Sequence, residues 1–428
     1  MNSSHKYFFG SKGYIGVTRD KKPFTAEYLQ GFEQVGKDLI DDIDGNRIGY
    51  SRGLVTVYNE MRRDAGSQYL QHVTESQYLA VAKGTLATKI IFDENRNAVA
   101  VEVITDKDEK IVINARQEII ISAGAIKSPQ LLMLSGLGPK KDLEKLNISC
   151  ICDMPVGKDL QDHIAAFIPH KTNKRIRRRN RSDPGEFPTG LFVGYGALNE
   201  SHAKHHTKYP DYQAIGLIVD NMKFMLQFCA STFNFPNATC NKLYDEANGN
   251  QVLITLLSNL YAHSRGQVQL RSTDPMDPPK VFTDSFSYDR DLEDFIKYIC
   301  HYLEVEDSEA FKSLGATMID LTKPRCDVFE KRSREYWRCY TLCMMVSLGH
   351  YSGTCAMGSV VDSRLRVHGV NRLRVADASI MPSHVTGNIV SAVVMIGEKA
   401  ADIIIEDAGP YNFVEHEKIR MDQIKNMP

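Results

Sequence analysis

Apolar and polar positions recur with two different periods along the chain, and together they predict a mixed α/β protein. Residues 25–40 and roughly 288–304 place apolar side chains at helical spacing, so both are predicted to form helices. Strict alternation on both sides of the turn at 93–97 predicts a β-hairpin, and similar alternation predicts a strand at 266–272. Residues 118–125 (EIIISAGA) are apolar on both faces, which is typical of a covered central strand.

This covered strand leads into a strand–turn–helix corner in the sequence ISAGAIKSPQLLMLSGLG. Ser128 is predicted to cap the helix, Pro129 to occupy its first position, and Gly136 to end it. Gly124 has no Cβ at the point where the chain leaves the strand, so the backbone at this point can approach a ligand closely. Nucleotides bind at the carboxyl ends of strands in α/β sheets, and a plain tight turn is the alternative interpretation.

Composition narrows the class of protein. The chain has 428 residues, is 43% hydrophobic and carries a formal net charge of −1. This balance argues against nucleic acid or an anionic membrane as a partner of the whole surface. The basic run KRIRRRNR (174–181) is interpreted as a solvated loop, with a nucleic-acid site as the alternative. Because no apolar run reaches 18 residues, no membrane span is predicted.

Cysteines and glycosylation sequons add two further expectations. The nine cysteines include no CxxC pair, and Cys150 and Cys152 alternate on a strand, so no metal site is predicted. The N-terminal MNSSHKYFFGSKG has no signal core of the usual length. Five N-glycosylation sequons favour a secreted, extracellular history; they lie at Asn2, Asn147, Asn180, Asn199 and Asn237.

Several segments, read together, resemble the glucose–methanol–choline (GMC) oxidoreductases. Residues 124–138 (GAIKSPQLLMLSGLG) match the second signature of that family. Four further matching segments follow in the family's order: 153–163 (DMPVGKDLQDH), 264–275 (SRGQVQLRSTDP), 350–358 (HYSGTCAMG) and 373–405. Within the family, these segments are most similar in sequence to the insect branch, which includes glucose dehydrogenases and ecdysone oxidases.

The resemblance implies an architecture of two domains. An FAD/NAD(P)-binding-like sheet domain is expected from 76–165 and 346–406. A substrate domain with an antiparallel sheet, the cap, is expected from 166–345, with 1–75 as a crossover segment. Residues 407–428 are expected to form a C-terminal tail.

The resemblance also implies a reaction. It is that of an FAD-dependent flavoprotein acting on the CH–OH group of a small-molecule alcohol, such as a sugar or a steroid. Hydride would pass to flavin N5, and oxygen or a quinone would accept the electrons. The Met- and Phe-rich segment 222–235 either lines an apolar substrate pocket or packs in the cap core.

One part of the family pattern has no counterpart in these residues. The family opens with a strand, a GxGxxG loop and an acidic residue for the ribose, whereas Gly10, Gly13 and Gly16 have the wrong spacing for that loop. The FAD domain is therefore expected to be incomplete at its N-terminus. A protein made of these 428 residues alone is expected to be colourless, poorly soluble and inactive. A catalytically inactive remnant acting as a binding protein is accordingly the alternative to an alcohol-oxidising enzyme.

The catalytic residues implied by the resemblance are His350 and Asn388. Neutral histidine suits the base that removes the hydroxyl proton near physiological pH. Asn388 can hydrogen-bond the substrate oxygen but cannot act as a second base. His384 lies four residues before Asn388, outside the aligned position.

The FAD contacts implied by the resemblance fall on four segments. They are the corner beside the cofactor, a strand residue whose backbone meets the adenine, a pair beside the pyrophosphate and ribityl chain, and backbone facing the flavin pyrimidine ring. Backbone N–H groups in the last position would stabilise negative charge on reduced flavin. In that order, the residues are Gly124, Ala87, Asp377 with Ala378, and Asn388 with Ile389.

Overall fold

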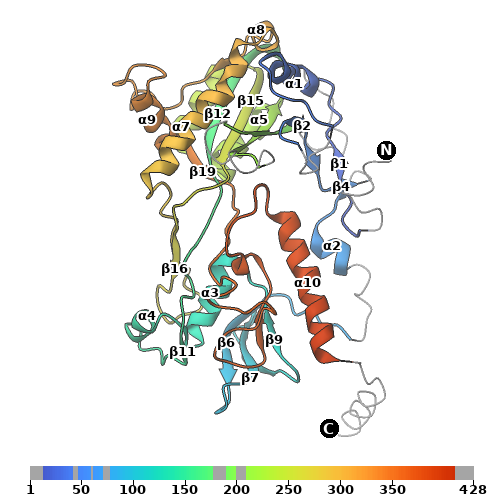
Figure 1. Cartoon of the computed structure of the whole chain (residues 1–428), viewed down its shortest axis with the longest axis vertical. Helices are drawn as coiled ribbons and strands as arrows, with labels where there is room; N and C mark the ends of the chain where they lie inside the picture. Colours follow the sequence, from blue (N-terminus) through green and yellow to red (C-terminus); the bar gives the residue numbers. More distant parts are fainter. Residues whose placement is uncertain are drawn as a thin grey trace.

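The chain folds into two lobes stacked along its long axis (Figure 1). The structure is a computed structural model that describes residues 13–41, 47–58, 61–70, 78–176, 189–198 and 209–409. Several features named in the sequence analysis lie outside these residues: Gly10, the sequons at Asn2, Asn180 and Asn199, most of the basic run and nearly all of the C-terminal tail. Helices and strands are mixed, as the two periodicities predict.

The upper lobe is built on a seven-stranded sheet in which every pairing is antiparallel. Its central strand β15 is buried at nine of its ten positions, so both faces of the sheet are covered. The order along the sheet is β18 (Thr317–Met318), β12 (Ile164–Arg175), β15 (Asn250–Asn259), β14 (Tyr212–Val219), β13 (Gly190–Gly196) and β2 (Tyr50–Arg52), and β19 (Met345–Ser347) also pairs with β12.

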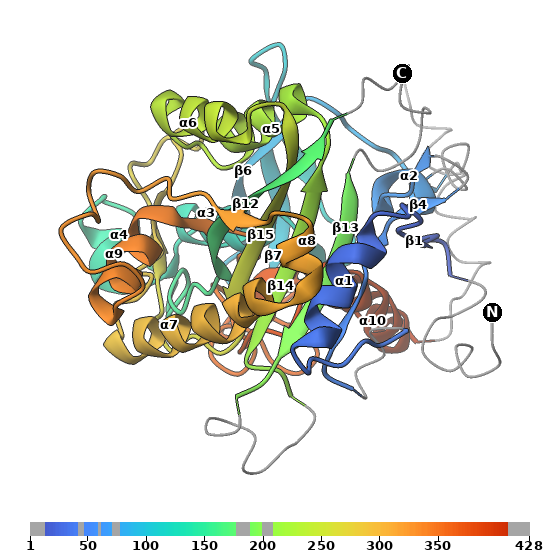
Figure 2. The ribbon, with the colours of Figure 1, turned by 90° about the horizontal axis from the view of Figure 1, so that it is seen from above.

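Helices cover both faces of this sheet, as Figure 2 shows from above. On one face lie α5 (Met222–Gln227), the π-helix Phe228–Thr232 and α6 (Asn237–Ala247). On the other lie α1 (Thr25–Gln34), α7 (Asp289–Leu303), the 3-10 helix Glu304–Asp307, α8 (Glu309–Ser313) and α9 (Arg334–Met344). The helix predicted at 288–304 is confirmed by α7. The helix predicted at 25–40 ends early, because Gly36 at φ +78° turns the chain.

The Met- and Phe-rich segment packs inside the upper lobe. Met225 is fully buried, and its aromatic neighbours pack against the same core while remaining partly exposed. A disulfide between Cys229 and Cys240 ties the π-helix to α6. These contacts favour the core-packing interpretation of 222–235.

The lower lobe combines a small antiparallel sheet with a parallel strand pair. The hairpin predicted around 93–97 is confirmed by β6 (Thr85–Phe92) and β7 (Ala98–Thr105). The parallel pair is β9 (Ile119–Ile121) with β20 (Leu373–Val375). The remaining elements are β8 (Lys110–Asn114), α3 (Gly124–Leu134), β10 (Leu137–Gly138), α4 (Lys140–Glu144), β11 (Cys152–Asp153), β16 (Gln267–Gln269), β17 (Lys280–Phe282), the 3-10 helix Ala378–Ile380 and α10 (Val390–Ala408).

Short elements line the N-terminal part of the chain. Strand β1 (Thr18–Arg19) pairs with β3 (Leu54–Val55), and β4 (Val57–Tyr58) pairs with β5 (Met61–Arg62). Helix α2 (Ala65–Leu70) follows them. They lie along one side of the two lobes in Figure 1.

Two sequence-based predictions about strands are wrong. Strand β9 is three residues long, Ile120 is 44% exposed, and among the described residues β9 pairs only with β20, so it is not a covered central strand. The alternating segment 266–272 was assigned to the cap. Its Val268 and Leu270 instead pack in the lower core, because the single apolar face on which both lie meets α3 rather than the large sheet.

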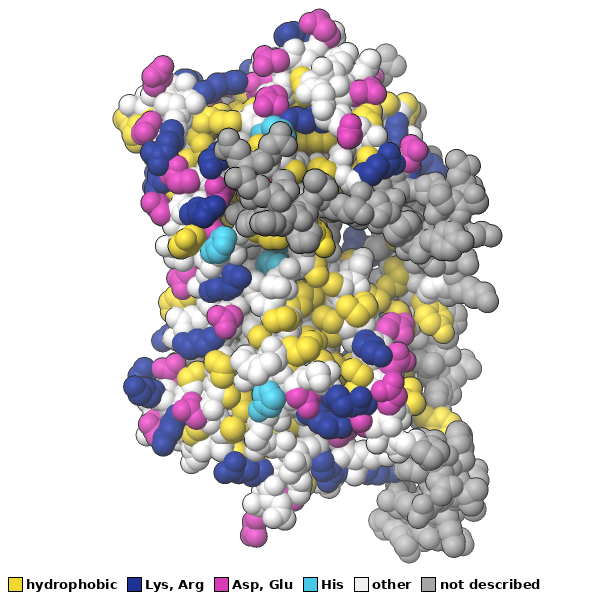
Figure 3. Space-filling view, in the orientation of Figure 1, with side chains coloured by type: hydrophobic (Ala, Val, Ile, Leu, Met, Phe, Trp, Pro, Cys, Tyr) yellow, Lys and Arg dark blue, Asp and Glu magenta, His cyan; other side chains and the backbone are white. Residues whose placement is uncertain are grey.

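Each lobe has its own hydrophobic core. The upper core draws on Tyr28 to Tyr50 and on 165–346, and the lower core draws on 90–160, 268–270 and 355–403. Exposed apolar side chains gather over the α10 region in Figure 3; on this helix they are Val390, Met395 and Ile405. No helix among the described residues combines the length and apolarity needed to cross a bilayer.

Candidate active site

The parallel strands β9 and β20 bring two functional segments to one edge of the lower lobe. Ile121 lies opposite Val375, so Ser122–Gly124 and Ala376–Ala378 both leave the sheet at its carboxyl edge. The Ser122 hydroxyl donates to the carbonyl of Ala376 at 2.9 Å, which joins the two segments directly. In α/β sheets, this edge is where nucleotide ligands bind.

Asp377 organises this edge through its carboxylate. One oxygen accepts the backbone N–H of Gly124 at 2.9 Å and the hydroxyl of Ser128, and the other accepts the N–H of Ser379 at 2.8 Å. The side chain is buried, so these donors meet its need for hydrogen bonds away from water. Asp377 therefore fixes the start of α3 relative to β20.

Gly124 leaves its backbone face open at the same edge. Its φ of +82° is a conformation that side chains rarely adopt, and a Cβ built there would meet nothing within 4 Å. The N–H of Gly124 is already donated to Asp377, so what this corner offers a dinucleotide cofactor is an open backbone face that it can approach closely. The described residues at this edge are thus compatible with FAD.

The roles predicted for Ser128 and Pro129 are wrong, because α3 begins at Gly124 and contains both. Ser128 instead donates to Asp377 and accepts the N–H of Ala123. Pro129 has no N–H, so it leaves the carbonyl of Ala125 free of its usual helical partner. That carbonyl accepts the hydroxyl of Thr354 at 2.6 Å. The proline thereby ties α3 to the segment that carries His350.

Three histidines meet at the boundary between the lobes. The Nδ1 atoms of His350 and His163 lie 3.0 Å apart, and Nε2 of His384 lies 2.8 Å from the carbonyl oxygen of His350. The rings of His163 and His384 have centroids 4.3 Å apart. Of these three, the resemblance implied only His350 as catalytic; it placed His384 outside the aligned position, and His163 was given no role.

Asp162 holds the backbone of His350. Its carboxylate accepts the N–H of His350 at 2.9 Å and the hydroxyl of Ser347. Burial raises the pKa of Asp162 to about 6, although these two hydrogen bonds lower it. The residue lies within the quoted segment DMPVGKDLQDH, directly before His163, so one short segment supplies two partners of His350.

Burial keeps the three histidines neutral at physiological pH. Desolvation, with a smaller contribution from the charge of His384, lowers the pKa of His350 from 6.5 to about 4. Desolvation likewise lowers the pKa of His384 to about 4 and that of His163 still further. A neutral His350 has a ring nitrogen available to accept a proton.

Acidification should therefore destabilise the protein between about pH 6.5 and pH 4. The unfolded chain binds protons at these histidines near pH 6.5, whereas the folded chain resists them until about pH 4, so their stabilising contribution is lost as the pH falls through this window. Asp162 acts oppositely, because its raised pKa favours the folded state at low pH, but it is one group against three. Melting temperatures across this window should fall less steeply in His384→Gln than in wild type, with exposed His368→Gln as the control. Equal slopes in all three proteins would contradict the assignment.

The other predicted residues divide into buried and exposed groups. Ala378 and Ile389 are buried, beside Asp377 and directly before α10 respectively. Asn388 is exposed, and Ala87 is exposed on β6 opposite Val103. Neither belongs to the hydrogen-bonded sets around Asp377 and His350 described above.

The upper lobe approaches the loop before α10, which contains Gly387, through Tyr195 of β13. A Cβ placed on Gly387 would lie 3.0 Å from the Tyr195 hydroxyl, which also accepts a hydrogen bond from the side chain of Gln213 at 2.8 Å. The sequence analysis missed Tyr195 because no local pattern on β13 marks it, and its approach to Gly387 is visible only in three dimensions.

Comparison with known proteins identifies the family to which the chain belongs. Family models described as GMC oxidoreductase match residues 3–165 and 262–397. An ecdysone oxidase of Spodoptera littoralis is 32% identical over 423 residues, covering 94% of this chain and 68% of the relative. A glucose dehydrogenase [FAD, quinone] of Drosophila pseudoobscura pseudoobscura is 29% identical, covering 91% and 63%. A formate oxidase structure from Aspergillus oryzae RIB40 superposes with a TM-score of 0.77 at 22% identity, covering 94% and 74%.

The chain belongs to the GMC oxidoreductase family. GMC oxidoreductases are FAD-binding flavoproteins, and the similar solved structures share the mixed α/β fold. The chain spans 61% to 68% of the lengths of the insect relatives named ecdysone oxidase or glucose dehydrogenase that it matches.

Proposed function

We propose that the protein containing this chain is an FAD-dependent oxidoreductase that oxidises the CH–OH group of a small-molecule alcohol. The observation that carries the proposal is the neutral, half-buried His350, held by Asp162 and His163 and tied through Thr354 to the edge organised by Asp377. A base near a cofactor edge is what alcohol oxidation requires of the protein. His350 is the proposed base.

The contact between His350 and His163 determines which tautomer the base needs. If Nδ1 of His350 carries the hydrogen and donates to Nδ1 of His163, then Nε2 of His350 is free to accept the alcohol proton. His163 must then carry its own hydrogen on Nε2, a buried atom with no hydrogen-bond partner among the described residues. His163, which is 1% exposed, is therefore proposed as a positioning residue that sets the tautomer of the base.

FAD, when bound, supplies the hydride acceptor. The residues proposed to hold it are Gly124 with its open backbone face, Asp377 and Ala378 beside that edge, and the backbone at Asn388 and Ile389. Ala87 is proposed at the adenine end. The exposed amide of Asn388 is available to orient a substrate hydroxyl.

The substrate class is proposed from the relatives and from the upper lobe. The similar insect proteins are named ecdysone oxidase and glucose dehydrogenase, which points to a steroid or sugar alcohol, with oxygen or a quinone as electron acceptor. Tyr195 presents a phenol beside Gly387, and a phenol offers both an apolar face and a hydrogen bond to a ring-shaped alcohol.

Anaerobic mixing of the flavin-loaded protein with candidate alcohols tests this function. An ecdysteroid, glucose and choline, each in excess, are the first panel, and loss of the oxidised flavin absorbance is the readout. We expect at least one of the first two to bleach the flavin. A protein that retains flavin and binds these alcohols but is reduced by none of a broad alcohol panel would instead be the inactive binding protein.

A further inference from the structure

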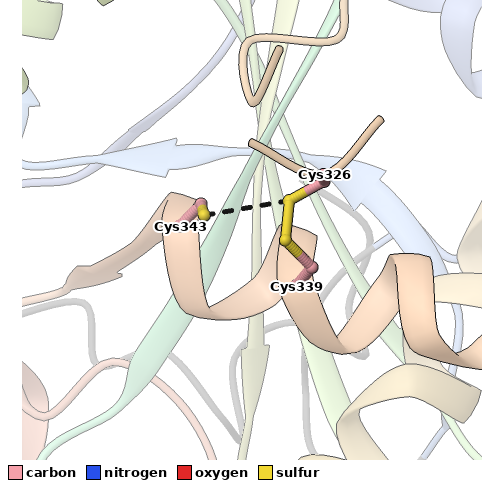
Figure 4. A group of neighbouring side chains, drawn as sticks. All are labelled: Cys326, Cys339 and Cys343. Atoms are coloured by element: carbon pink, nitrogen blue, oxygen red, sulfur yellow. Dashed lines mark hydrogen bonds between the residues drawn. A yellow bond between two sulfur atoms is a disulfide. The ribbon is translucent and has the colours of Figure 1, made fainter. Parts of the chain in front are cut away.

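Three cysteine sulfurs lie together in the upper lobe, between α9 and the loop that precedes it (Figure 4). Cys326 and Cys339 form a disulfide, and the sulfur of the free Cys343 lies 3.9 Å from that of Cys326. All three sulfurs lie within 4.8 Å of one another. A free thiol close to a disulfide sulfur is one requirement for exchange, because exchange proceeds by attack of a thiolate on that sulfur. Attack also has to come in line with the disulfide, so the Cys343 side chain must swing away from Cys339, which its sulfur now also approaches within 4.8 Å.

Helix geometry gives Cys326 two alternative partners. Cys339 and Cys343 are four residues apart on α9, so both project from one face of the helix. Cys326 is buried, whereas the other two are partly exposed, so whichever of them is free is accessible to water. The sequence separations are 13 for Cys326–Cys339 and 17 for Cys326–Cys343, so chain entropy scarcely distinguishes the two pairings.

We propose that Cys326, Cys339 and Cys343 form a thiol–disulfide exchange site. The thiolate of Cys343 attacks the sulfur of Cys326, a Cys326–Cys343 bond forms, and the Cys326–Cys339 bond breaks. Cys339 leaves as a thiolate and takes up the proton that Cys343 released. One disulfide and one thiol are present before and after, so no external oxidant or reductant is consumed.

Exchange moves a covalent tether along α9. The attachment point shifts by one helical turn, about 5.4 Å, toward the carboxyl end of the helix. That end leads directly into β19, which pairs with β12, and then into His350. The pairing thus determines whether the last turn of α9, just before the segment of the proposed base, is tied to the Cys326 loop.

Slow alkylation of the native wild-type protein tests the exchange. A low concentration of N-ethylmaleimide traps whichever thiol is free, and peptides cleaved at Tyr340 or Leu342 separate Cys339 from Cys343. Because trapping competes with exchange, we expect label on both Cys339 and Cys343, with one label per molecule within the three cysteines. Label confined to Cys343 after prolonged incubation, with the Cys326–Cys339 bond intact, would overturn the proposal.

Two variants separate exchange within this group from attack by other thiols. In Cys343→Ser, Cys339 should stay unlabelled, because its bond to Cys326 has lost the attacking thiol. In Cys339→Ser, Cys326 and Cys343 should pair, which non-reducing peptide mapping detects. Labelling of Cys339 at the wild-type level in Cys343→Ser, or two free thiols in folded Cys339→Ser, would each contradict the assignment. None of these measurements depends on flavin or on the histidines.

Discussion

In the flavin-loaded full-length protein that contains this chain, His350→Ala should slow flavin reduction by substrate about 10²–10⁴-fold, the usual cost of losing a general base. The effect should fall on the chemical step, because Gly124 and Asp377, which are proposed to hold the cofactor, lie on other segments and keep their contacts. Anaerobic single-turnover reduction, followed by flavin absorbance, measures this rate directly. Flavin content should match that of wild type.

Asn388→Ala and His384→Ala are the matched comparisons. Losing the orienting amide of Asn388 should cost roughly tenfold to a hundredfold, about 1–3 kcal/mol. His384 contacts His350 through the backbone carbonyl and not through the ring, so its loss should cost roughly twofold to tenfold. If His384→Ala proves the most damaging while His350→Ala remains near wild type, the assignment of the base is wrong.

Asp377→Ala should destabilise the fold by roughly 3 kcal/mol or more, because several buried donors would lose the carboxylate that accepts their hydrogen bonds. The N–H groups of Gly124 and Ser379 and the hydroxyl of Ser128 would lose their partner in a buried place. Thermal or urea unfolding measures the loss. Flavin retention should fall with it, because Asp377 fixes the edge where the cofactor is proposed to bind.

Two milder variants show whether the carboxylate acts through these hydrogen bonds. Asp377→Asn keeps one acceptor oxygen and most of the volume, so it should cost less than alanine. Ser128→Ala removes one of the donors together with the acceptor of the Ala123 N–H, and should cost about 1 kcal/mol. An Asp377→Ala protein as stable as wild type would show that water replaces the carboxylate and that the edge is not organised by it.

Local sequence patterns predicted correctly those elements whose own periodicity matches the packing around them. The apolar stripe of 288–304 became α7 because one face packs on β15, and the alternation around 93–97 became a hairpin because its turn is local. The prediction that 118–125 forms a covered central strand was wrong, because a run that is apolar on both faces does not reveal how many strands pair with it. The prediction that Pro129 starts the helix was also wrong. A proline is tolerated inside a helix when another segment supplies a donor for the carbonyl that it leaves free, as Thr354 does here for Ala125.

Candidate site residues could be predicted from the sequence only where they lie in a segment that resembles the family. His350 and Asp377 lie in segments that resemble the family, and the structure ties them to one edge through Thr354, Ala125 and Ser128. His163 lies 187 positions from His350, and no local spacing signals that their rings meet. The segment DMPVGKDLQDH was recognised as a block, but its Asp-His ending was not assigned a role. A polar pair directly before a long buried strand was the available signal.

Strand β12 attaches Asp162, His163 and His350 mechanically to the upper sheet. Asp162 and His163 directly precede it, and β19, which pairs with it, leads into His350. Asp377 and Gly124 belong to the lower lobe, and Thr354 is anchored there on Ala125. The chain from His350 to Thr354 is therefore a strap of four residue steps, which spans at most roughly 14 Å when fully extended. However the lobes move, the proposed base cannot travel farther than this from its anchor unless that anchor breaks.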